Sequence, residues 1–458
     1  MKKFIKQLVL PILVILIISG EIKSQSIFNM TLLGTKNEFT AGGTPADWHY
    51  ASSWGWTAPN GREYAIIGHY AGTTFYDITN TNNIVNCGTI SGPGSFYNYR
   101  EMATYQNYCY VVSEGGAGIQ IIDMQYLPDS VRLVKSYTFP GYTRSHSVRI
   151  FDRFLYSNGG NFNNGGVFIL DLLDPINPVR RGQWGTRYVH DCFVRNDTLF
   201  ACCISSSPPN LTVLDVRNKD SIKQITQWTY PGAVTHNAWT TEDGKYLVTT
   251  DEGGSNHAKI WDIQNIMSPV QVYDIMPYEL SMVHNAYVKG DSLYLAHYRA
   301  GLIVYNISNP NFPVEVGHYD TYPGTGTAFQ GAWNCYPYFA SGKIVVSDIK
   351  SGLYIVKLGT SVNITNTSSE VKDYKLSQNF PNPFNPETKI SYSLPVVSDV
   401  KLVIFNSNGM EVGKYVYENQ KAGSYEITWD GKDLSSGVYY YKLTAGSFTD
   451  TKKMVLVK

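Results

Sequence analysis

Histidine side chains recur at a nearly fixed spacing along this sequence. Seven positions, roughly 44–51 residues apart, each stand at the start of a short apolar segment. Five of them hold histidine, and in chain order the seven are His49, Arg100, His146, His190, His236, His284 and Gln330. Neutral imidazole nitrogen is a ligand for transition metals, and protonated imidazole binds anions. A fold that gathers these positions would therefore build a metal site or an anion site.

Carboxylates join this chemistry in only two of the repeats. Glu114 stands in a Ser-Glu-Gly-Gly loop, and Asp251 and Glu252 stand in an Asp-Glu-Gly-Gly loop. Imidazole nitrogen and carboxylate oxygen together are a common ligand set for zinc. A divalent metal ion is therefore the candidate cofactor, and its candidate ligands are His190, His236 and His284. The wider set of ligand-binding candidates is His49, Arg100, His146, His190, His236, His284, Glu114, Asp251 and Glu252.

A purely structural role for the histidines is the alternative. Sequence repeats copy residues, so a recurrent histidine can serve in every copy to hydrogen-bond the backbone of a neighbouring unit. The two carboxylate loops are not copied in this way. Both explanations of the histidines stay open from the sequence.

Each of these positions opens a unit that contains up to four predicted strands. In the sixth unit the strand-forming segments are 283–287, 292–301, 302–310 and 314–319. Four strands in about 40–50 residues is the size of one β-propeller blade. The sequence therefore predicts an all-β chain in which residues 27–358 form a seven-bladed β-propeller.

Blade geometry predicts where the chemistry lies. The chain enters the innermost strand of a blade at one face of the ring, and the loop between the second and third strands returns to that face. The histidine positions should therefore surround one mouth of the central channel. The loops expected beside them carry His69, Glu114, Asp251, Glu252, His257, Tyr298 and Arg299. With His297, which directly precedes Tyr298, this arrangement puts eight of the nine histidines on that face and leaves only His318 in an outer strand.

The third strand of each unit carries a short motif. It reads IQIID at Ile119–Asp123 and LIVYN at Leu302–Asn306. These units resemble the LVIVD-repeat β-propellers, a group that includes choice-of-anchor B-like proteins. The resemblance implies a propeller and a surface location, but no particular activity. The Asp or Asn that ends the motif is expected to cap its own turn, with calcium binding as the alternative.

The two ends of the repeat region predict a closed ring. The seventh unit stops after its third strand, and the early segment Met30–Thr35 matches the fourth-strand pattern Val314–Tyr319. An open ring would leave free strand edges, which promote aggregation. We therefore expect the early segment to complete the last blade.

Beyond the repeats, residues 359–374 are polar and read as a linker, and residues 375–458 show alternating strands typical of a small immunoglobulin-like β-sandwich. This tail resembles the type A C-terminal sorting domain of the type IX secretion system. The motif residues that carry the resemblance include Asn379, Pro381, Pro383, Asn385, Pro386 and Gly437. The resemblance implies the secretion machinery as partner, passage across the outer membrane, and removal of the tail as the cargo is released or attached to the surface. A stable accessory domain is the alternative.

Residues 1–24 have the layout of a signal peptide, with basic residues before an apolar run that ends at Ile18. No later stretch is apolar enough for a transmembrane span in the mature protein. The secretory route permits disulfides. Cys192 and Cys203 could pair across a hairpin that turns at Asn196 and Asp197, or all six cysteines stay reduced.

Composition narrows the partners. Lys and Arg total 37 and Asp and Glu total 37, so the net charge is zero and the chain lacks the basic surface that nucleic-acid binding requires. No nucleophile elbow, His-Glu-x-x-His motif or phosphate loop is present. Two hypotheses follow: an exported, secreted or surface-attached binding protein with a glycan or protein ligand, or a metal-dependent hydrolase or lyase with its site at the histidine-lined channel mouth.

Overall fold

The computed structural model describes residues 27–40, 42–43, 48–93, 97, 99–253, 257–276, 281–322, 329–359, 373–420, 422–432 and 434–458. The expected signal peptide and most of the expected linker lie outside these residues. The chain divides into two compact units, Met1–Gly359 and Thr360–Lys458. We call them the ring unit and the C-terminal unit. Among the described residues, no helix has the length and apolar character that a membrane span requires.

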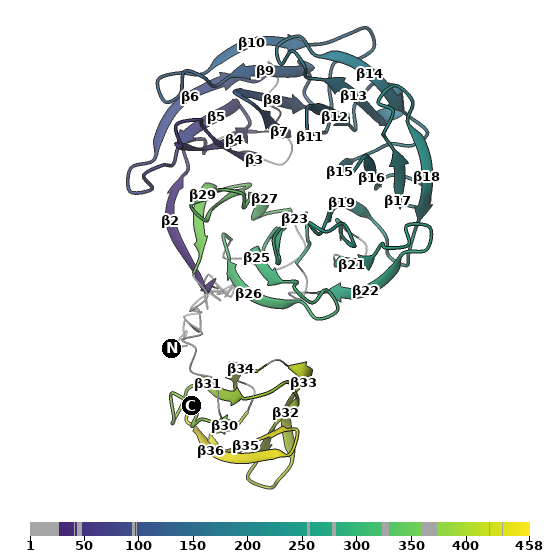
Figure 1. Cartoon of the computed structure of the whole chain (residues 1–458). Helices are drawn as coiled ribbons and strands as arrows, with labels where there is room; N and C mark the ends of the chain where they lie inside the picture. The colour runs from purple at the N-terminus through teal and green to yellow at the C-terminus, as the bar shows by residue number, and fades with distance from the viewer. Residues whose placement is uncertain are drawn as a thin grey trace, which may run out of the picture. The chain divides into compact units, whose positions relative to one another are not determined.

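The ring unit is built from antiparallel sheets, which is consistent with propeller blades. Its described residues form seven sheets arranged around a ring (Figure 1). Four of the sheets comprise β3 (Tyr50–Thr57), β4 (Glu63–His69), β5 (Gly72–Asp77) and β6 (Val85–Ser91); β7 (Arg100–Tyr105), β8 (Tyr108–Ser113), β9 (Ile119–Asp123) and β10 (Arg132–Tyr137); β11 (Ser147–Phe151), β12 (Phe154–Asn158), β13 (Val167–Asp171) and β14 (Val179–Trp184); and β15 (Asp191–Arg195), β16 (Thr198–Cys203), β17 (Asn210–Asp215) and β18 (Lys223–Trp228).

The other three sheets complete the ring. They comprise β19 (Thr235–Thr240), β20 (Tyr246–Asp251), β21 (Ala258–Asp262) and β22 (Val270–Ile275); β23 (Asn285–Lys289), β24 (Ser292–His297), β25 (Gly301–Asn306), β26 (Val314–Tyr319) and β1 (Ile27–Phe28); and β27 (Ala332–Tyr336), β28 (Lys343–Asp348), β29 (Gly352–Leu358) and β2 (Met30–Lys36). A short 3₁₀ turn, η1, spans Asn163–Gly165. The first strand of each sheet is innermost, and each contacts the next one around the ring, including β27 with β3.

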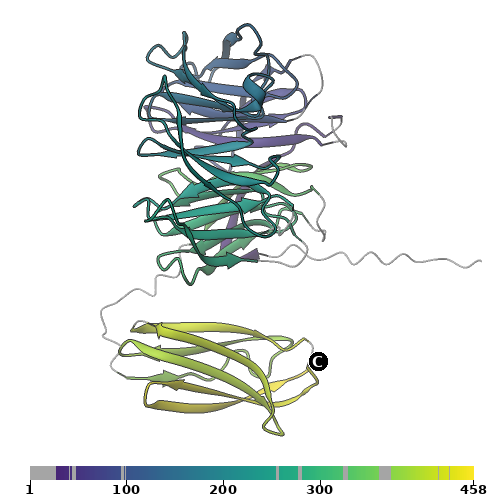
Figure 2. The same ribbon diagram turned by 90° about the vertical axis from the view of Figure 1, so that its right-hand side faces the viewer.

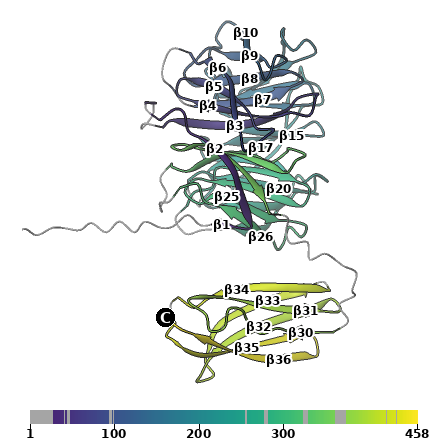
Figure 3. The same cartoon turned by 90° about the vertical axis from the view of Figure 1, so that its left-hand side faces the viewer.

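The N-terminal segment closes the ring, as predicted. Strand β2 pairs antiparallel with β29, from Met30 opposite Leu358 to Lys36 opposite Leu353. It occupies the outer position of its sheet (Figure 1). An unexpected addition is β1, which pairs with the outer edge of β26 (Figure 3). The first residues of the described chain therefore join two neighbouring sheets.

Turn capping by the recurrent Asp or Asn is confirmed. The Asp77 Oδ1 atom accepts a hydrogen bond from the Thr79 backbone N–H at 2.9 Å, and Asp262 Oδ1 accepts one from Gln264 at 2.9 Å. The same bond forms at Asp123, Asp171, Asp215 and Asn306. These side chains therefore hold the turn between the third and fourth strands of their sheets.

The cysteines take the reduced alternative. All six are free and buried. The hairpin does turn at Asn196 and Asp197, both with positive φ, but its register places Cys192 opposite Ala201 rather than Cys203.

The C-terminal unit contains two antiparallel sheets with one apolar core. Its strands are β30 (Lys375–Leu376), β31 (Glu387–Leu394), β32 (Ser398–Asn406), β33 (Glu411–Gln420), β34 (Gly423–Asp430), β35 (Gly437–Ala445) and β36 (Phe448–Leu456). The long strands lie side by side in Figure 2. Buried and exposed residues alternate along β31, as a sheet with one face on the core requires.

The sorting-motif residues hold this unit together. Asn379 is buried, and its Nδ2 atom donates to Thr388 Oγ1 at 2.9 Å and to the Pro381 carbonyl at 3.1 Å. The Pro386 carbonyl accepts the Gly431 N–H at 2.9 Å. Gly437 begins β35 and pairs with Leu456. The motif therefore ties the start of the unit to its last strands.

Ring closure by β2 can be measured. The Met30 side chain is 7% exposed in the main core of the ring, whereas Leu32, on the same strand, is 42% exposed. We expect Met30→Ala to lower the free energy of unfolding by about 2 kcal/mol or more, because it leaves a cavity in the core. Leu32→Ala, the matched control, should change it much less. Urea denaturation of the full chain measures both, and equal effects would contradict the anchoring role of Met30.

Candidate functional site

A cavity of about 520 Å³ opens where the innermost strands begin. Its walls come from the segments before these strands and from the loops that follow second strands such as β8, β20 and β24. This is the face that the blade geometry predicted. The lining residues are Trp48, Tyr97, Tyr99, Glu114, His146, Tyr188, His190, His236, Glu252, His284, Tyr298, Phe329 and Trp333.

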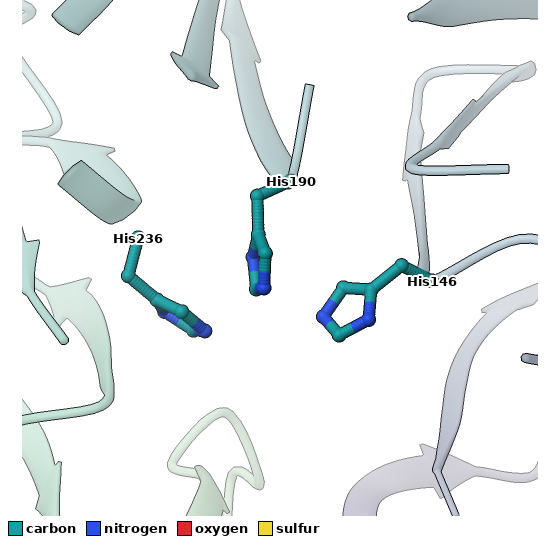
Figure 4. A group of neighbouring side chains, drawn as sticks. All are labelled: His146, His190 and His236. Atoms are coloured by element: carbon teal, nitrogen blue, oxygen red, sulfur yellow. The ribbon is translucent and has the colours of Figure 1, made fainter. Parts of the chain in front are cut away.

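Four histidines form an arc along this cavity. Their rings follow one another from sheet to sheet, with centroids 3.9 Å apart for His146 and His190, 4.3 Å for His190 and His236, and 4.2 Å for His236 and His284. Figure 4 shows the first three side chains converging on one space. The repeat places them because each precedes or lies at the start of an innermost strand.

The hydrogen bonds of two histidines define their tautomers. The His236 Nδ1 atom lies 3.1 Å from the carbonyl oxygen of His284, and the His284 Nδ1 atom lies 2.5 Å from that of Trp333. A carbonyl oxygen only accepts, so both Nδ1 atoms carry the proton. Each bond reaches the next sheet, which is the structural role that the sequence left open. The Nε2 atom of each ring is therefore unprotonated, and its lone pair can accept a hydrogen bond or bind a metal ion.

Those lone pairs face a carboxylate. Glu252 Oε2 lies 3.6 Å from His236 Nε2, and Glu252 Oε1 lies 3.5 Å from His284 Nε2. The Tyr298 hydroxyl donates to Glu252 Oε1 at 2.6 Å. Burial lowers the pKa of His236 well below its ordinary value and that of His284 to about 3, with neighbouring histidine charge adding to the effect. Both imidazoles are therefore neutral near pH 7.

His146 differs from these two in charge. Its Nδ1 atom lies 2.5 Å from Glu114 Oε1, and the Tyr97 hydroxyl donates to Glu114 Oε2 at 3.2 Å. Burial opposes protonation, but the hydrogen bond and charge of Glu114 outweigh it and raise the pKa of His146. Between these groups, the Nδ1 atom of His190 is buried and has no hydrogen-bond partner among the described residues.

Three predicted site residues do not line the cavity. The His49 Nδ1 atom lies 3.3 Å from the Lys350 carbonyl, and the Arg100 Nε atom donates to the His69 carbonyl at 2.9 Å. Asp251 is buried and accepts from Lys259 Nζ at 2.7 Å, because it ends strand β20 and faces the next strand. Its neighbour Glu252 lies beyond the strand and reaches the cavity.

The other residues of the expected loops make contacts away from the cavity. His69 stacks on Phe39, His257 pairs with Asp274 at 2.7 Å, and His297 lies 2.9 Å from Ser281 Oγ. Arg299 donates to Gln330 at 2.8 Å. Four histidines, rather than eight, therefore meet at the cavity in the described part of the chain.

The sequence did not reveal a buried polar belt directly beyond the arc. Arg149 Nη1 lies 3.2 Å from Glu101 Oε2, and Arg149 Nη2 lies 2.5 Å from Asp191 Oδ2. Hydrogen bonds continue this belt through every innermost strand, and its members are Ser52, Glu101, Arg149, Asp191, Asn237, Asn285 and Asn334. A usable signal was present, since four members directly follow a repeat position, as Asp191 follows His190.

Comparison with known proteins identifies the second unit. Residues 378–458 match the model of the secretion system C-terminal sorting domain. The C-terminal unit is a type IX secretion sorting domain. It directs the protein across the outer membrane, to the cell surface or into the surroundings.

Solved structures resemble the chain only distantly. One is PorZ of Porphyromonas gingivalis, an essential bacterial surface component of the type-IX secretion system of that organism, with 11% identity and a TM-score of 0.49. The alignment covers 91% of this chain and 60% of that one. A protein from Lactobacillus plantarum has 12% identity and a TM-score of 0.49, over 83% of this chain and 99% of that one. No curated protein matches the sequence.

The belt predicts a large effect of one substitution. Arg149→Met leaves Glu101 and Asp191 buried without their cation, so we expect the free energy of unfolding to fall by about 3–5 kcal/mol. Arg217→Met, the control, removes the exposed partner of Asp215 and should change stability little. Adding Glu101→Gln and Asp191→Asn to Arg149→Met should recover part of the loss. Denaturant unfolding measures all three variants, and a harmless Arg149→Met would contradict this role.

The arc predicts contrasting protonation states. In the presence of a chelator, His236 and His284 should stay neutral in the Nδ1–H tautomer between pH 8 and 5, whereas His146 should titrate above its ordinary pKa of 6.5. Because that folded-state pKa is raised, the stability it contributes is complete below pH 6.5 and is lost as the pH rises through the raised value. Long-range ¹H–¹⁵N spectra of ¹⁵N-histidine-labelled protein measure tautomer and charge. A protonated His284 at pH 6 would contradict the assignment.

Proposed function

We propose that this chain is an exported binding protein whose ring unit holds a glycan, with a protein ligand as the alternative. In this proposal residues 1–24 are a signal peptide, residues 27–358 form a seven-bladed propeller of the LVIVD-repeat type, and residues 359–374 are a linker. Residues 375–458 are then a type A sorting domain with an immunoglobulin-like fold. The closed ring of seven sheets and the match to the sorting-domain model support this organisation.

The composition of the cavity wall is the observation that carries the proposal. Seven aromatic side chains line it together with four histidines and two glutamates. Trp48, Tyr99 and Trp333 pack against one another, with ring centroids 5.4–5.6 Å apart. A sugar ring has apolar C–H faces that fit aromatic surfaces and hydroxyl groups that pair with imidazole or carboxylate. Binding sites commonly combine such apolar walls with a few convergent polar groups.

Phe329 provides the test of this proposal. It lines the cavity and is 43% exposed, and Phe312, 62% exposed, lies in the loop between β25 and β26 and provides a matched control. The full chain is titrated with a panel of glycans and peptides. We expect at least one ligand whose affinity falls about tenfold in Phe329→Ala, which corresponds to about 1.4 kcal/mol of binding free energy. Phe312→Ala should leave that affinity unchanged. Calorimetric titration measures both, and an absence of cavity-dependent ligands would reject the proposal.

A metal-dependent hydrolase or lyase is the second candidate function. The convergence of His236, His284 and Glu252 beside an open cavity favours it. A screen of hydrolase and lyase substrates, with and without added Zn²⁺, separates the two functions. Turnover that is lost on chelation would support the enzyme, whereas saturable binding without turnover supports the binding protein.

A further inference from the structure

We infer that His236 Nε2, His284 Nε2 and the carboxylate of Glu252 form a binding site for one divalent transition-metal ion. The inference rests on the proposed function in one respect, since it assigns a polar anchor within the same cavity. It differs from the ligand set expected from sequence, because Glu252 takes the place of His190. The three residues come from β19, from the loop after β20 and from the segment before β23.

The distances between the ligand atoms are the first argument. The two N···O separations are 3.5 and 3.6 Å, which is beyond an ordinary hydrogen bond. Zinc bonds to nitrogen and oxygen measure about 2.0–2.2 Å, so a tetrahedral ion holds its ligand atoms about 3.3–3.6 Å apart. The two separations run to different oxygens of the Glu252 carboxylate, and each is close to the length of one edge of a zinc tetrahedron.

The direction of the lone pairs is the second argument. Both Nδ1 protons are committed to backbone carbonyls, so each Nε2 atom turns a lone pair toward a carboxylate. Lone pairs and carboxylate oxygens repel one another when nothing lies between them. A metal ion placed between these atoms attracts both the lone pairs and the carboxylate. No Lys or Arg side chain is then needed to offset the repulsion.

The surroundings of the three residues are the third argument. Histidines that bind metals commonly donate their other N–H to a carbonyl, and metal-binding carboxylates are themselves hydrogen-bonded. His236 and His284 satisfy the first condition, and Glu252 satisfies the second through the Tyr298 hydroxyl. Tyr298 is thus a positioning residue, 1% exposed and fixed behind the carboxylate.

A neighbouring group competes for the same role. His146, His190 and His236 also bring their nitrogen atoms within 4.8 Å of one another. However, the Glu114 carboxylate 2.5 Å from His146 Nδ1 raises the pKa of His146, so a metal ion at its Nε2 atom competes with a proton that His236 and His284 do not carry near pH 7. The group with Glu252 also supplies the negative charge that a divalent ion requires. With three protein ligands, its fourth position opens to the cavity, where a ligand oxygen can bind.

The test uses full-length protein purified without a histidine tag and treated with chelator. We expect it to take up one Zn²⁺ per chain, and Co²⁺ to give the visible absorption of a tetrahedral site. His284→Gln and Glu252→Gln should each weaken Zn²⁺ binding about 100-fold in competition with a fluorescent chelator. His146→Gln and His190→Gln, the matched controls from the competing group, should change it less than fivefold. Tyr298→Phe should weaken it about tenfold and keep the cobalt spectrum tetrahedral.

Each outcome decides for or against the site. The site would be overturned if the folded protein took up no Zn²⁺. It would also be overturned if Zn²⁺ affinity fell in the His146 and His190 variants instead of the His284 and Glu252 variants. Thermal unfolding of every variant identifies any that fails to fold, and the cobalt spectrum of the others then decides. Failure of the site is distinguishable from failure of the proposed function. Ligand binding that depends on Phe329 without Zn²⁺ would leave the function standing, and Zn²⁺ uptake without a glycan or peptide ligand would leave only the metal site.

Discussion

The ring depends on a belt of buried polar side chains in its innermost strands, which the backbone N–H of Ala286 closes by donating to Asn237 Oδ1. Each of the seven strands contributes one member, and the only fully charged cation in it, Arg149, lies between Glu101 and Asp191. Buried polar groups cost free energy unless they find partners, and the hydrogen bonds that continue the belt join neighbouring sheets. The sheets must therefore adopt one register relative to one another. Apolar packing alone tolerates small shifts, whereas this belt does not.

The histidine arc takes its position from the belt. His190, His236 and His284 directly precede the belt residues Asp191, Asn237 and Asn285, so each pair of neighbours shares one backbone segment. Trp333 joins the two layers, since its carbonyl accepts from His284 and its indole N–H donates to Glu101 at 3.3 Å. A histidine whose backbone is fixed by the neighbouring belt residue has a defined orientation at the cavity, which is a condition for metal or ligand binding.

The sequence was most informative where the same local pattern repeats. The Asp or Asn turn cap follows from a short motif within each unit, and the unit length and the fourth strand expected at Met30–Thr35 follow from comparing the units with one another. It was least informative about the contacts between units. Asp251 and Glu252 are adjacent and chemically alike, but one ends a strand and meets Lys259, while the other lies past the strand end and faces two histidines. Only the register of β20 distinguishes them, and register depends on long-range pairing.

The two explanations that the sequence left open for the histidines are not exclusive. An imidazole has two nitrogen atoms, and the repeat uses one of them for structure: Nδ1 of His236 and of His284 binds the backbone of the next sheet. That bond also fixes the tautomer, which frees Nε2 as an acceptor at the cavity. The repeated part of the sequence thus supplies preorganised imidazoles. The unrepeated loop after β20 adds the carboxylate with which these imidazoles bind one cation. A function can arise in such a ring by changing one loop, because the repeat has already placed its partners.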